Sequence, residues 1–295
     1  RGSTNTMMIG GDGDDTYYVD SSADAITESA SPMSMHDVVY FSGATGTYTL
    51  SAEIEELNLT GVGAINGTGN ALANVINGNA GNNILDGGAN PMALGDTMTG
   101  GLGNDTYIVD DSFDKAYENF GGGVDTVIVK AANYSIDYLF GPMNPTNIEV
   151  MQVDASVGAG VTVTLQGNIY NQSITGHAGA DIIDGRGGAD IMTGLAGNDT
   201  YYVDNLGDRV VEVALGGTDT VHSTVSYILP NEVEDLYLDG AVGNLRGTGN
   251  ALANHIYGNM MDNVLDGRGG IDTMDGGMGN DVYIVDNAAD VINDT

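Results

Sequence analysis

The sequence predicts an all-β fold, a parallel β-solenoid (β-roll) in which short strands and tight turns alternate along the chain. Three observations lead to this prediction. A nine-residue pattern recurs, a pattern of about 90 residues contains it, and 46 of the 295 residues are glycine. Glycine accepts the positive φ angles of tight turns and disfavours long helices. We therefore expect many short strands connected by glycine-rich turns.

The nine-residue repeat follows the template G-G-x-G-x-D-x-U-x, where U is a large apolar residue and places are counted from the first glycine. It fits GGLGNDTYI at 100–108, GLAGNDTYY at 194–202 and GGMGNDVYI at 276–284. Six residues should form a turn, in which Asp or Asn bonds nearby backbone, and three should form a strand with U pointing inward. Tyr17, Tyr107, Tyr201 and Tyr283 are therefore expected in the core.

Two such steps return the chain to the same edge of the solenoid, one layer of about 4.8 Å higher. Asp181, Asp190, Asp199 and Asp208 follow one another at intervals of nine residues. We therefore expect Asp181 to stack on Asp199, and Asp190 to stack on Asp208.

The larger repeat begins with GDDTYYVD at 13, GNDTYIVD at 103, GNDTYYVD at 197 and GNDVYIVD at 279. It predicts repeat unit 1 at 1–102, which begins mid-unit, unit 2 at 103–196, unit 3 at 197–278, and the start of a truncated unit 4 at 279–295. We expect one continuous solenoid rather than separate domains. Because both ends fall inside a unit, we expect a fragment of a longer array or a subunit that polymerises end to end.

Several segments depart from the template. TLSAEIEELNLTG at 49–61 and TVHSTVSYIL at 220–229 alternate apolar and polar residues, which predicts longer strands without metal. An insertion around Pro91 should distort the turn before Asp96. Some rungs carry an amide at place six, which predicts either weak metal sites or metal-free amide ladders; these residues are Asn74, Asn83, Gln172, Asn254 and Asn263.

The charge of the chain limits its partners. It has 41 acidic residues against 7 Lys and Arg, for a formal net charge of −34. Nucleic acids and anionic membranes attract basic surfaces, so neither is an expected partner. Disorder is the simplest interpretation of such acidity, but 41% apolar residues and 15 Tyr provide enough material for a core. The chain has no run of apolar residues long enough to span a membrane.

Stacked carboxylates require a positive partner. Two carboxylates about 5 Å apart repel by roughly 3 kcal/mol at an effective dielectric constant near 20. The ligands on offer are oxygens from carboxylates and turn carbonyls, which suit Ca²⁺ better than Mg²⁺. Zinc and copper prefer imidazole or thiolate, and the chain has no Cys. The sequence therefore predicts several bound Ca²⁺ ions.

With these motifs, the chain resembles the calcium-binding RTX (haemolysin-type) nonapeptide repeats of bacterial proteins exported by type I secretion. The resemblance implies a parallel β-roll with Ca²⁺ between successive turns, held by place-six Asp carboxylates and turn carbonyls. On the matching positions it implicates Asp15, Asp96, Asp105, Asp181, Asp190, Asp199, Asp272 and Asp281. Counting onward from the tyrosine rungs extends this set to Asp24, Asp114, Asp125, Asp208, Asp219 and Asp290.

No catalytic motif is recognisable, and we expect that the chain is not an enzyme. The four histidines, His36, His177, His222 and His255, are scattered and are expected at the surface. The acidic pairs Glu55–Glu56 and Glu234–Asp235 recur in equivalent strands, which favours a scaffold role over catalysis.

Three functions are compatible with these features. The first is a calcium-binding structural segment of a secreted or cell-surface bacterial protein, such as an adhesin, a surface layer or an extracellular fibre. The second is a C-terminal folding and secretion module of a secreted enzyme, and the third is a calcium-dependent carbohydrate-binding module. The first is favoured by the long array of units. Its expected partners are calcium, other copies of the chain end to end, or a cell-surface or matrix ligand, and we expect folding to be coupled to calcium binding.

Overall fold

The computed structural model describes residues 6–29, 36–90, 94–136, 146–240 and 243–294. They belong to two compact units, unit 1 at 1–152 and unit 2 at 153–295, and each unit is described by itself. All regular elements in these ranges are β-strands, so the all-β prediction is confirmed. Within the same ranges, no helix is long and apolar enough to cross a bilayer.

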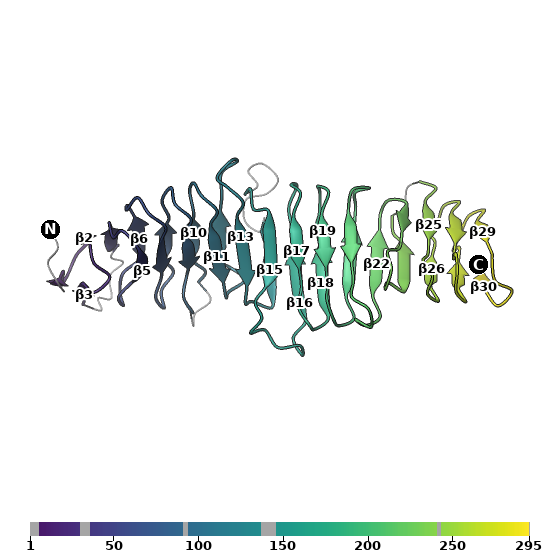
Figure 1. Ribbon diagram of the computed structural model, residues 1–295, viewed down its shortest axis with the longest axis horizontal. Coiled ribbons are helices and arrows are strands. Elements are labelled where there is room, and N and C mark those ends of the chain that lie inside the picture. Colours follow the sequence, from purple (N-terminus) through teal and green to yellow (C-terminus); the bar gives the residue numbers. More distant parts are fainter. Residues whose placement is uncertain (1–5, 30–35, 91–93, 137–145, 241–242, 295) are drawn as a thin grey trace. The chain divides into compact units, whose positions relative to one another are not determined.

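Unit 1 is a parallel β-solenoid whose strands form successive rungs (Figure 1). Strands β2, β4, β6, β8, β10 and β12 form one parallel sheet, and β5, β7, β9, β11 and β13 form a second. A separate two-stranded sheet pairs β1 with β3. The strands are β1 (Met7–Ile9), β2 (Thr16–Val19), β3 (Ala25–Thr27), β4 (Val38–Phe41), β5 (Gly46–Thr49), β6 (Glu56–Leu59), β7 (Ile65–Thr68), β8 (Val75–Asn77), β9 (Ile84–Asp86), β10 (Thr97–Thr99), β11 (Thr106–Val109), β12 (Lys115–Tyr117), β13 (Thr126–Val129) and β14 (Asn133–Ser135), and β15 (Val150–Val153) spans the division between the units.

Unit 2 has the same construction (Figure 1). The even-numbered strands β16 to β30 form one parallel sheet, β17, β19 and β21 lie in a second, and β23, β25, β27 and β29 form a third. The strands are β16 (Val163–Gln166), β17 (Ser173–Thr175), β18 (Asp181–Asp184), β19 (Ile191–Thr193), β20 (Thr200–Val203), β21 (Arg209–Val211), β22 (Thr220–Ser223), β23 (Tyr227–Ile228), β24 (Asp235–Leu238), β25 (Arg246–Thr248), β26 (His255–Tyr257), β27 (Val264–Asp266), β28 (Thr273–Asp275), β29 (Val282–Ile284) and β30 (Val291–Asn293).

The strand register follows the nine-residue repeat. Thr97 pairs with Lys115 in unit 1, and Met192 pairs with Val210 in unit 2, so one turn of the solenoid takes two nonapeptides. Insertions lengthen the turns and leave the pairing intact, since Thr106 pairs with Thr126 across the longer turn at 118–125. Each added residue is therefore absorbed outside the sheets.

The core lies between the sheets of each unit, because alternate residues of short strands point inward. Tyr107 in unit 1 and Tyr201 in unit 2 are 0% exposed, and Tyr17 is buried as well. The prediction of a core position is confirmed for these three tyrosines. Tyr283 is only half-buried, because its strand β29 is the last strand of its sheet and has a neighbour on one side.

One detail of the prediction was wrong, and another lies outside the described residues. Segments 49–61 and 220–229 do not form longer strands, because each is divided by a turn into two short strands, β5 and β6 or β22 and β23. The expected distortion around Pro91 lies in residues 91–93, outside the described residues, and Asp96 after it is fully buried.

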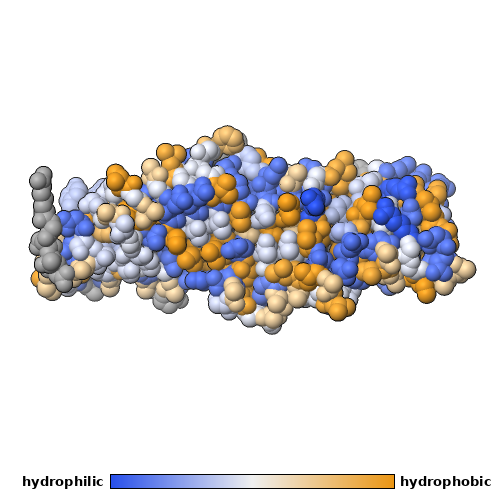
Figure 2. All heavy atoms as spheres, viewed as in Figure 1, coloured by the Kyte–Doolittle hydropathy of each residue, from blue (hydrophilic) through white to orange (hydrophobic). Residues whose placement is uncertain are grey.

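Outward-facing aromatic side chains of unit 2 stack on one another along the strands. The ring centroids are 5.3 Å apart for Tyr202 and His222, 4.9 Å for His222 and Tyr237, and 4.3 Å for Tyr237 and Tyr257. Hydrophilic and apolar residues are interspersed on the drawn face of both units (Figure 2). The parallel in-register strands thus place like side chains in ladders on the surface as well as in the core.

Candidate metal centres

Place-six residues form a ladder along each edge, because each turn delivers its place-six side chain just before a strand. The Asp181 amide donates a hydrogen bond of 2.7 Å to Oδ1 of Asp199, and the Asp190 amide donates one of 3.0 Å to Oδ1 of Asp208. The predicted stacking of these pairs is therefore confirmed. In each pair, the backbone of one rung occupies only one carboxylate oxygen of the next.

The second oxygen has no partner in eight of the fourteen predicted ligands. Their Oδ2 atoms are buried and accept no hydrogen bond, although buried polar atoms in proteins are nearly always paired. Several of these oxygens lie beside the place where a Cβ on the place-one glycine would stand, as Asp190 Oδ2 does at Gly185. The eight residues are Asp96, Asp105, Asp125, Asp190, Asp199, Asp219, Asp272 and Asp281.

Burial makes these carboxylates reluctant to carry charge. It raises the pKa of Asp96, Asp190 and Asp199 to about 7 each, against the lowering effect of one backbone hydrogen bond. Neighbouring carboxylates raise the pKa further, as Asp208 and Asp204 do for Asp190. At neutral pH, these carboxylates therefore keep a full negative charge only when a cation pairs with them.

Four other predicted ligands differ, because backbone amides occupy both of their oxygens. Asp114 accepts the Asp96 amide on Oδ1 and the Asp110 and Asp111 amides on Oδ2. Such a carboxylate closes its own turn with local hydrogen bonds. The same arrangement holds for Asp24, Asp208 and Asp290.

The remaining two predicted ligands have individual surroundings. Asp181 accepts the His177 amide at 2.6 Å and lies 2.8 Å from His177 Nδ1. His177 is buried, so the expectation of a surface position was wrong for this histidine. The imidazole lies beside the carboxylate within the turn because the two residues are four apart. Asp15 is half-buried and belongs to an acidic cluster described below.

Where place six carries Asn or Gln, the side-chain amide forms hydrogen bonds through both its oxygen and its nitrogen, so the turn closes without a cation. Asn74 accepts the Asn70 amide and donates its Nδ2 to the carbonyl of Ile54 at 2.9 Å. Asn254 repeats this with the Asn250 amide and the Val233 carbonyl. Of the two predicted alternatives, the structure favours the amide ladder; Asn83, Asn263 and Gln172 are hydrogen-bonded in a similar way.

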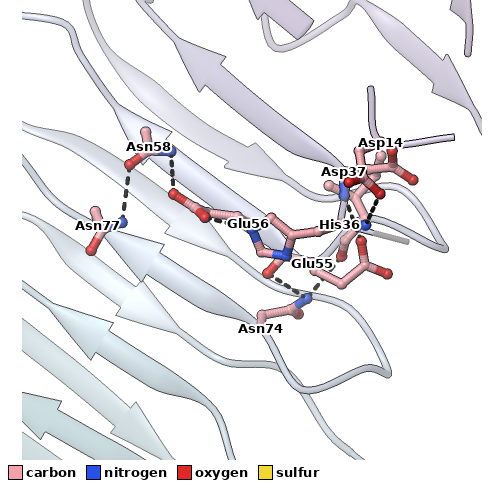
Figure 3. Close-up of polar contacts among 9 residues, drawn as sticks. Asp14, His36, Asp37, Glu55, Glu56, Asn58, Asn74 and Asn77 are labelled. Carbon is pink, nitrogen blue, oxygen red and sulfur yellow. Dashed lines mark hydrogen bonds and ion pairs between the residues drawn. The ribbon is translucent and has the colours of Figure 1, made fainter. Parts of the chain in front are cut away.

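Glutamates continue the Asp ladders at one end. Glu55 Oε2 accepts the Asp37 amide at 2.8 Å, and the Glu55 carbonyl accepts Asn74 Nδ2 at 3.5 Å (Figure 3). The adjacent Glu56 instead turns to His36, 2.8 Å away, and to Asn58 (Figure 3). Glu149 and Glu234 accept the amides of Asp125 and Asp219 in the same way. This geometry gives these acids the scaffold role that their recurrence predicts.

Among the described residues, acids from different rungs come together in four clusters, and each could hold a metal ion. In each cluster, one ligand atom per residue lies within 4.8 Å of the others. Sequence reasoning missed the glutamates in them, because the template has glycine at that place, and did not select Asp37 or Asp286. The clusters are Asp15–Glu28–Asp37, Asp105–Glu118–Asp125, Asp199–Glu212–Asp219 and Asp272–Asp286–Asp290.

The donor set fits a hard cation. The available atoms are buried carboxylate oxygens without hydrogen-bond donors, and glycine turns bring backbone carbonyls close to them. Ca²⁺ binds six to eight such oxygens in flexible geometry. Bound there, it would neutralise carboxylates of neighbouring rungs and hold the turns together.

Comparison with known families agrees with this chemistry. The family described as RTX calcium-binding nonapeptide repeat matches the chain in four copies, over residues 7–26, 68–90, 95–113, 166–201 and 248–292. The search among curated proteins finds no significant match.

Proposed function

Because this chain is an RTX calcium-binding nonapeptide-repeat protein, we propose that it is a non-catalytic structural segment that folds and rigidifies on binding Ca²⁺. It would serve a secreted or cell-surface bacterial protein of the adhesin, surface-layer or extracellular-fibre type. The observation that carries this proposal is the row of eight buried Asp Oδ2 atoms without a partner. A buried charge persists only when it is paired or coordinates a metal.

The coupling between calcium and folding follows from the charge of the chain. The chain has a formal net charge of −34 and 46 glycines. Unfolding therefore moves like charges apart and releases a large conformational entropy, and both effects favour the unfolded chain. Low calcium inside the cell would leave the Asp-rich rungs loose enough for export, which agrees with the type I secretion typical of the family. Calcium outside the cell would then close the turns.

A carbohydrate-binding function receives less support. Sugar rings pack on open aromatic faces, whereas Tyr202, His222, Tyr237 and Tyr257 use their faces to stack on one another. The aromatic ladder of unit 2 therefore offers mainly ring edges, and we assign it a role in strand alignment.

Far-UV circular dichroism of the full chain tests the proposal. We expect a large loss of strand signal after calcium is removed with a chelator, and its return on titration with Ca²⁺. Equal concentrations of Mg²⁺ serve as the control and should restore much less signal, since Mg²⁺ demands an octahedral site. A full strand spectrum in chelator would contradict the proposal.

A further inference from the structure

An acid recurs at place one of the turn that follows each tyrosine rung. Gly10, Gly100 and Gly194 are the place-one glycines of these rungs, and Glu28, Glu118 and Glu212 stand 18 residues after them. One solenoid turn therefore places each glutamate beside the earlier glycine. The segments 114–165 and 202–247, which contain Glu118 and Glu212, lie outside the residues that match the RTX family.

In unit 1, this register makes three side chains converge. Asp105 Oδ2, Glu118 Oε1 and the Tyr107 hydroxyl surround the point where a Cβ on Gly100 would stand. Glycine is required there because any side chain would fill the space that these oxygens share. Asp125, one rung further, completes the cluster within the same 4.8 Å limit.

The same constellation recurs in unit 2. Asp199 Oδ2, Glu212 Oε1 and the Tyr201 hydroxyl surround the corresponding point on Gly194, and Asp219 completes the cluster. A third copy in unit 1 joins Asp15, Glu28 and Asp37 near Tyr17 and Gly10. The same arrangement of Asp, Glu and Tyr occurs in separate parts of the chain, which indicates a specific binding site rather than a chance grouping of acids.

The aspartates of these clusters are incompletely satisfied. Asp105 and Asp125 are 1% and 0% exposed, each Oδ1 accepts one backbone amide, and each Oδ2 accepts nothing. Asp199 and Asp219 show the same pattern in unit 2. The orphaned Asp105 Oδ2 faces Glu118, so the cluster has buried lone pairs aimed at its own centre.

Each glutamate is held in position by hydrogen bonds. The Tyr107 hydroxyl accepts the Gly100 amide at 2.7 Å and is hydrogen-bonded to Glu118 Oε1. Glu118 Oε2 accepts the Asn119 amide at 3.2 Å, and Glu212 is held likewise by Tyr201 and the Val213 amide. The carboxyl therefore has a defined orientation before any ion binds.

We infer that Glu28, Glu118 and Glu212 are calcium ligands of a second kind, each completing a three-carboxylate site at a tyrosine rung. The inference rests on the proposed function and extends it. These sites differ from ordinary turns, where place one is glycine and only two aspartates contribute charge. Higher ligand charge tightens Ca²⁺ binding, so these sites fill first. Tyr17, Tyr107 and Tyr201 are positioning residues that hold the glutamates.

Terbium luminescence tests the inference, because Tb³⁺ occupies calcium sites and is excited through nearby aromatic rings. The chain has no Trp, so tyrosines provide the excitation, and the clusters lie against tyrosine hydroxyls. We expect most of the first sensitised phase of a Tb³⁺ titration to weaken at least tenfold in affinity in the double variant E118Q/E212Q, while the Glu28 site keeps its share of that phase. The matched control E53Q/E232Q removes the same charge from residues outside the clusters and should titrate like the wild type.

The outcomes separate this inference from the proposed function. If the wild type binds neither Ca²⁺ nor Tb³⁺, the proposed function fails. If the wild type binds both, and E118Q/E212Q titrates like E53Q/E232Q, the place-one glutamates are not ligands and only this inference fails.

A second measurement needs no variant and therefore does not depend on how the variants fold. Anomalous scattering from Tb³⁺-soaked wild-type crystals should place ions in contact with Glu118 and Glu212. Ions coordinated by Asp105 and Asp125 with Glu118 turned away would overturn the inference.

Discussion

The rungs around Asn74 and Asn83 and the rungs around Asp105 and Asp125 share one backbone design in unit 1, yet they differ in what closes them. In the amide rungs, Asn74 Nδ2 donates to the Ile54 carbonyl. In the carboxylate rungs, the corresponding Oδ2 of Asp105 or Asp125 can only accept, and nothing donates to it. Replacing one nitrogen by oxygen thus changes a self-sufficient turn into one that needs a cation.

Unit 2 repeats this difference. Asn254 bonds the Val233 carbonyl, whereas Asp190 and Asp199 each keep a buried, unpartnered oxygen. The comparison teaches that one strand register carries both kinds of rung. An amide or a carboxylate at place six, together with the backbone amides of its own turn, decides which rungs depend on calcium.

Calcium removal should give the largest difference in stability between the carboxylate rungs and the amide rungs. Each site filled at 100 times its Kd contributes about 2.7 kcal/mol, which the carboxylate rungs lose together. We expect hydrogen exchange of the chelator-treated protein to accelerate far more at 96–129 than at 67–87. Equal acceleration in both segments would contradict the distinction.

A lower pH should partly restore the stability that the protein loses when calcium is removed. Burial raises the pKa of Asp96, Asp190 and Asp199 to about 7, so the folded state binds more protons than the unfolded state between about pH 4 and 7. Stability of the calcium-depleted protein should therefore fall as the pH rises through this window. Thermal melts from pH 4.5 to 8 measure it, and a Tm that rises with pH would refute the argument.

Asn74→Asp should destabilise the calcium-free protein by roughly 3 kcal/mol, because a buried carboxylate would face the Ile54 carbonyl without a donor. Urea unfolding of the strand structure that remains in chelator measures this change. Asn66→Asp is the matched control, since its Oδ1 keeps the Ile84 amide and its side chain is only half-buried; it should cost much less. An equal loss of unfolding free energy in the two variants would show that the place-six amide has no particular role in closing the turn.

Asp199→Asn should lower calcium affinity about tenfold, or 1.4 kcal/mol, because it removes charge from an unpartnered ligand. Asn83→Asp should disturb calcium affinity less. Isothermal titration calorimetry compares them, with Asp262→Asn as a control at an exposed acid. A loss of affinity in the control as large as in Asp199→Asn would mean that net charge, not the site, controls binding.

Much of the fold follows from the sequence, because the repeat itself encodes it. Place six, the inward tyrosines and the stacking of Asp181 on Asp199 are readable from spacing alone. The glutamates of the acidic clusters could not be predicted from spacing in this way. Glu118 was missed because the template has glycine at place one, where this chain has a glutamate.

Local turn chemistry explains the other differences. Whether a place-six Asp is satisfied depends on neighbouring amides, as at Asp114, and spacing does not reveal where those amides point. The burial of His177 likewise depends on its bond to Asp181 across one turn. The periodicity of the sequence predicts which residues lie in successive layers of the solenoid. The hydrogen bonds within each turn can be found only from the three-dimensional structure.

The amide-to-carboxylate bonds that connect successive rungs have a further consequence. The Asp105 amide bonds Asp125, and the Asp125 amide bonds Glu149, so ordering one carboxylate fixes the backbone that carries the next ligand. Ion binding within such a string should therefore be cooperative. Amide rungs such as Asn83 need no ion and end the string. We accordingly expect the steepness of the calcium response to depend on the length of each uninterrupted carboxylate run, not on the total number of sites.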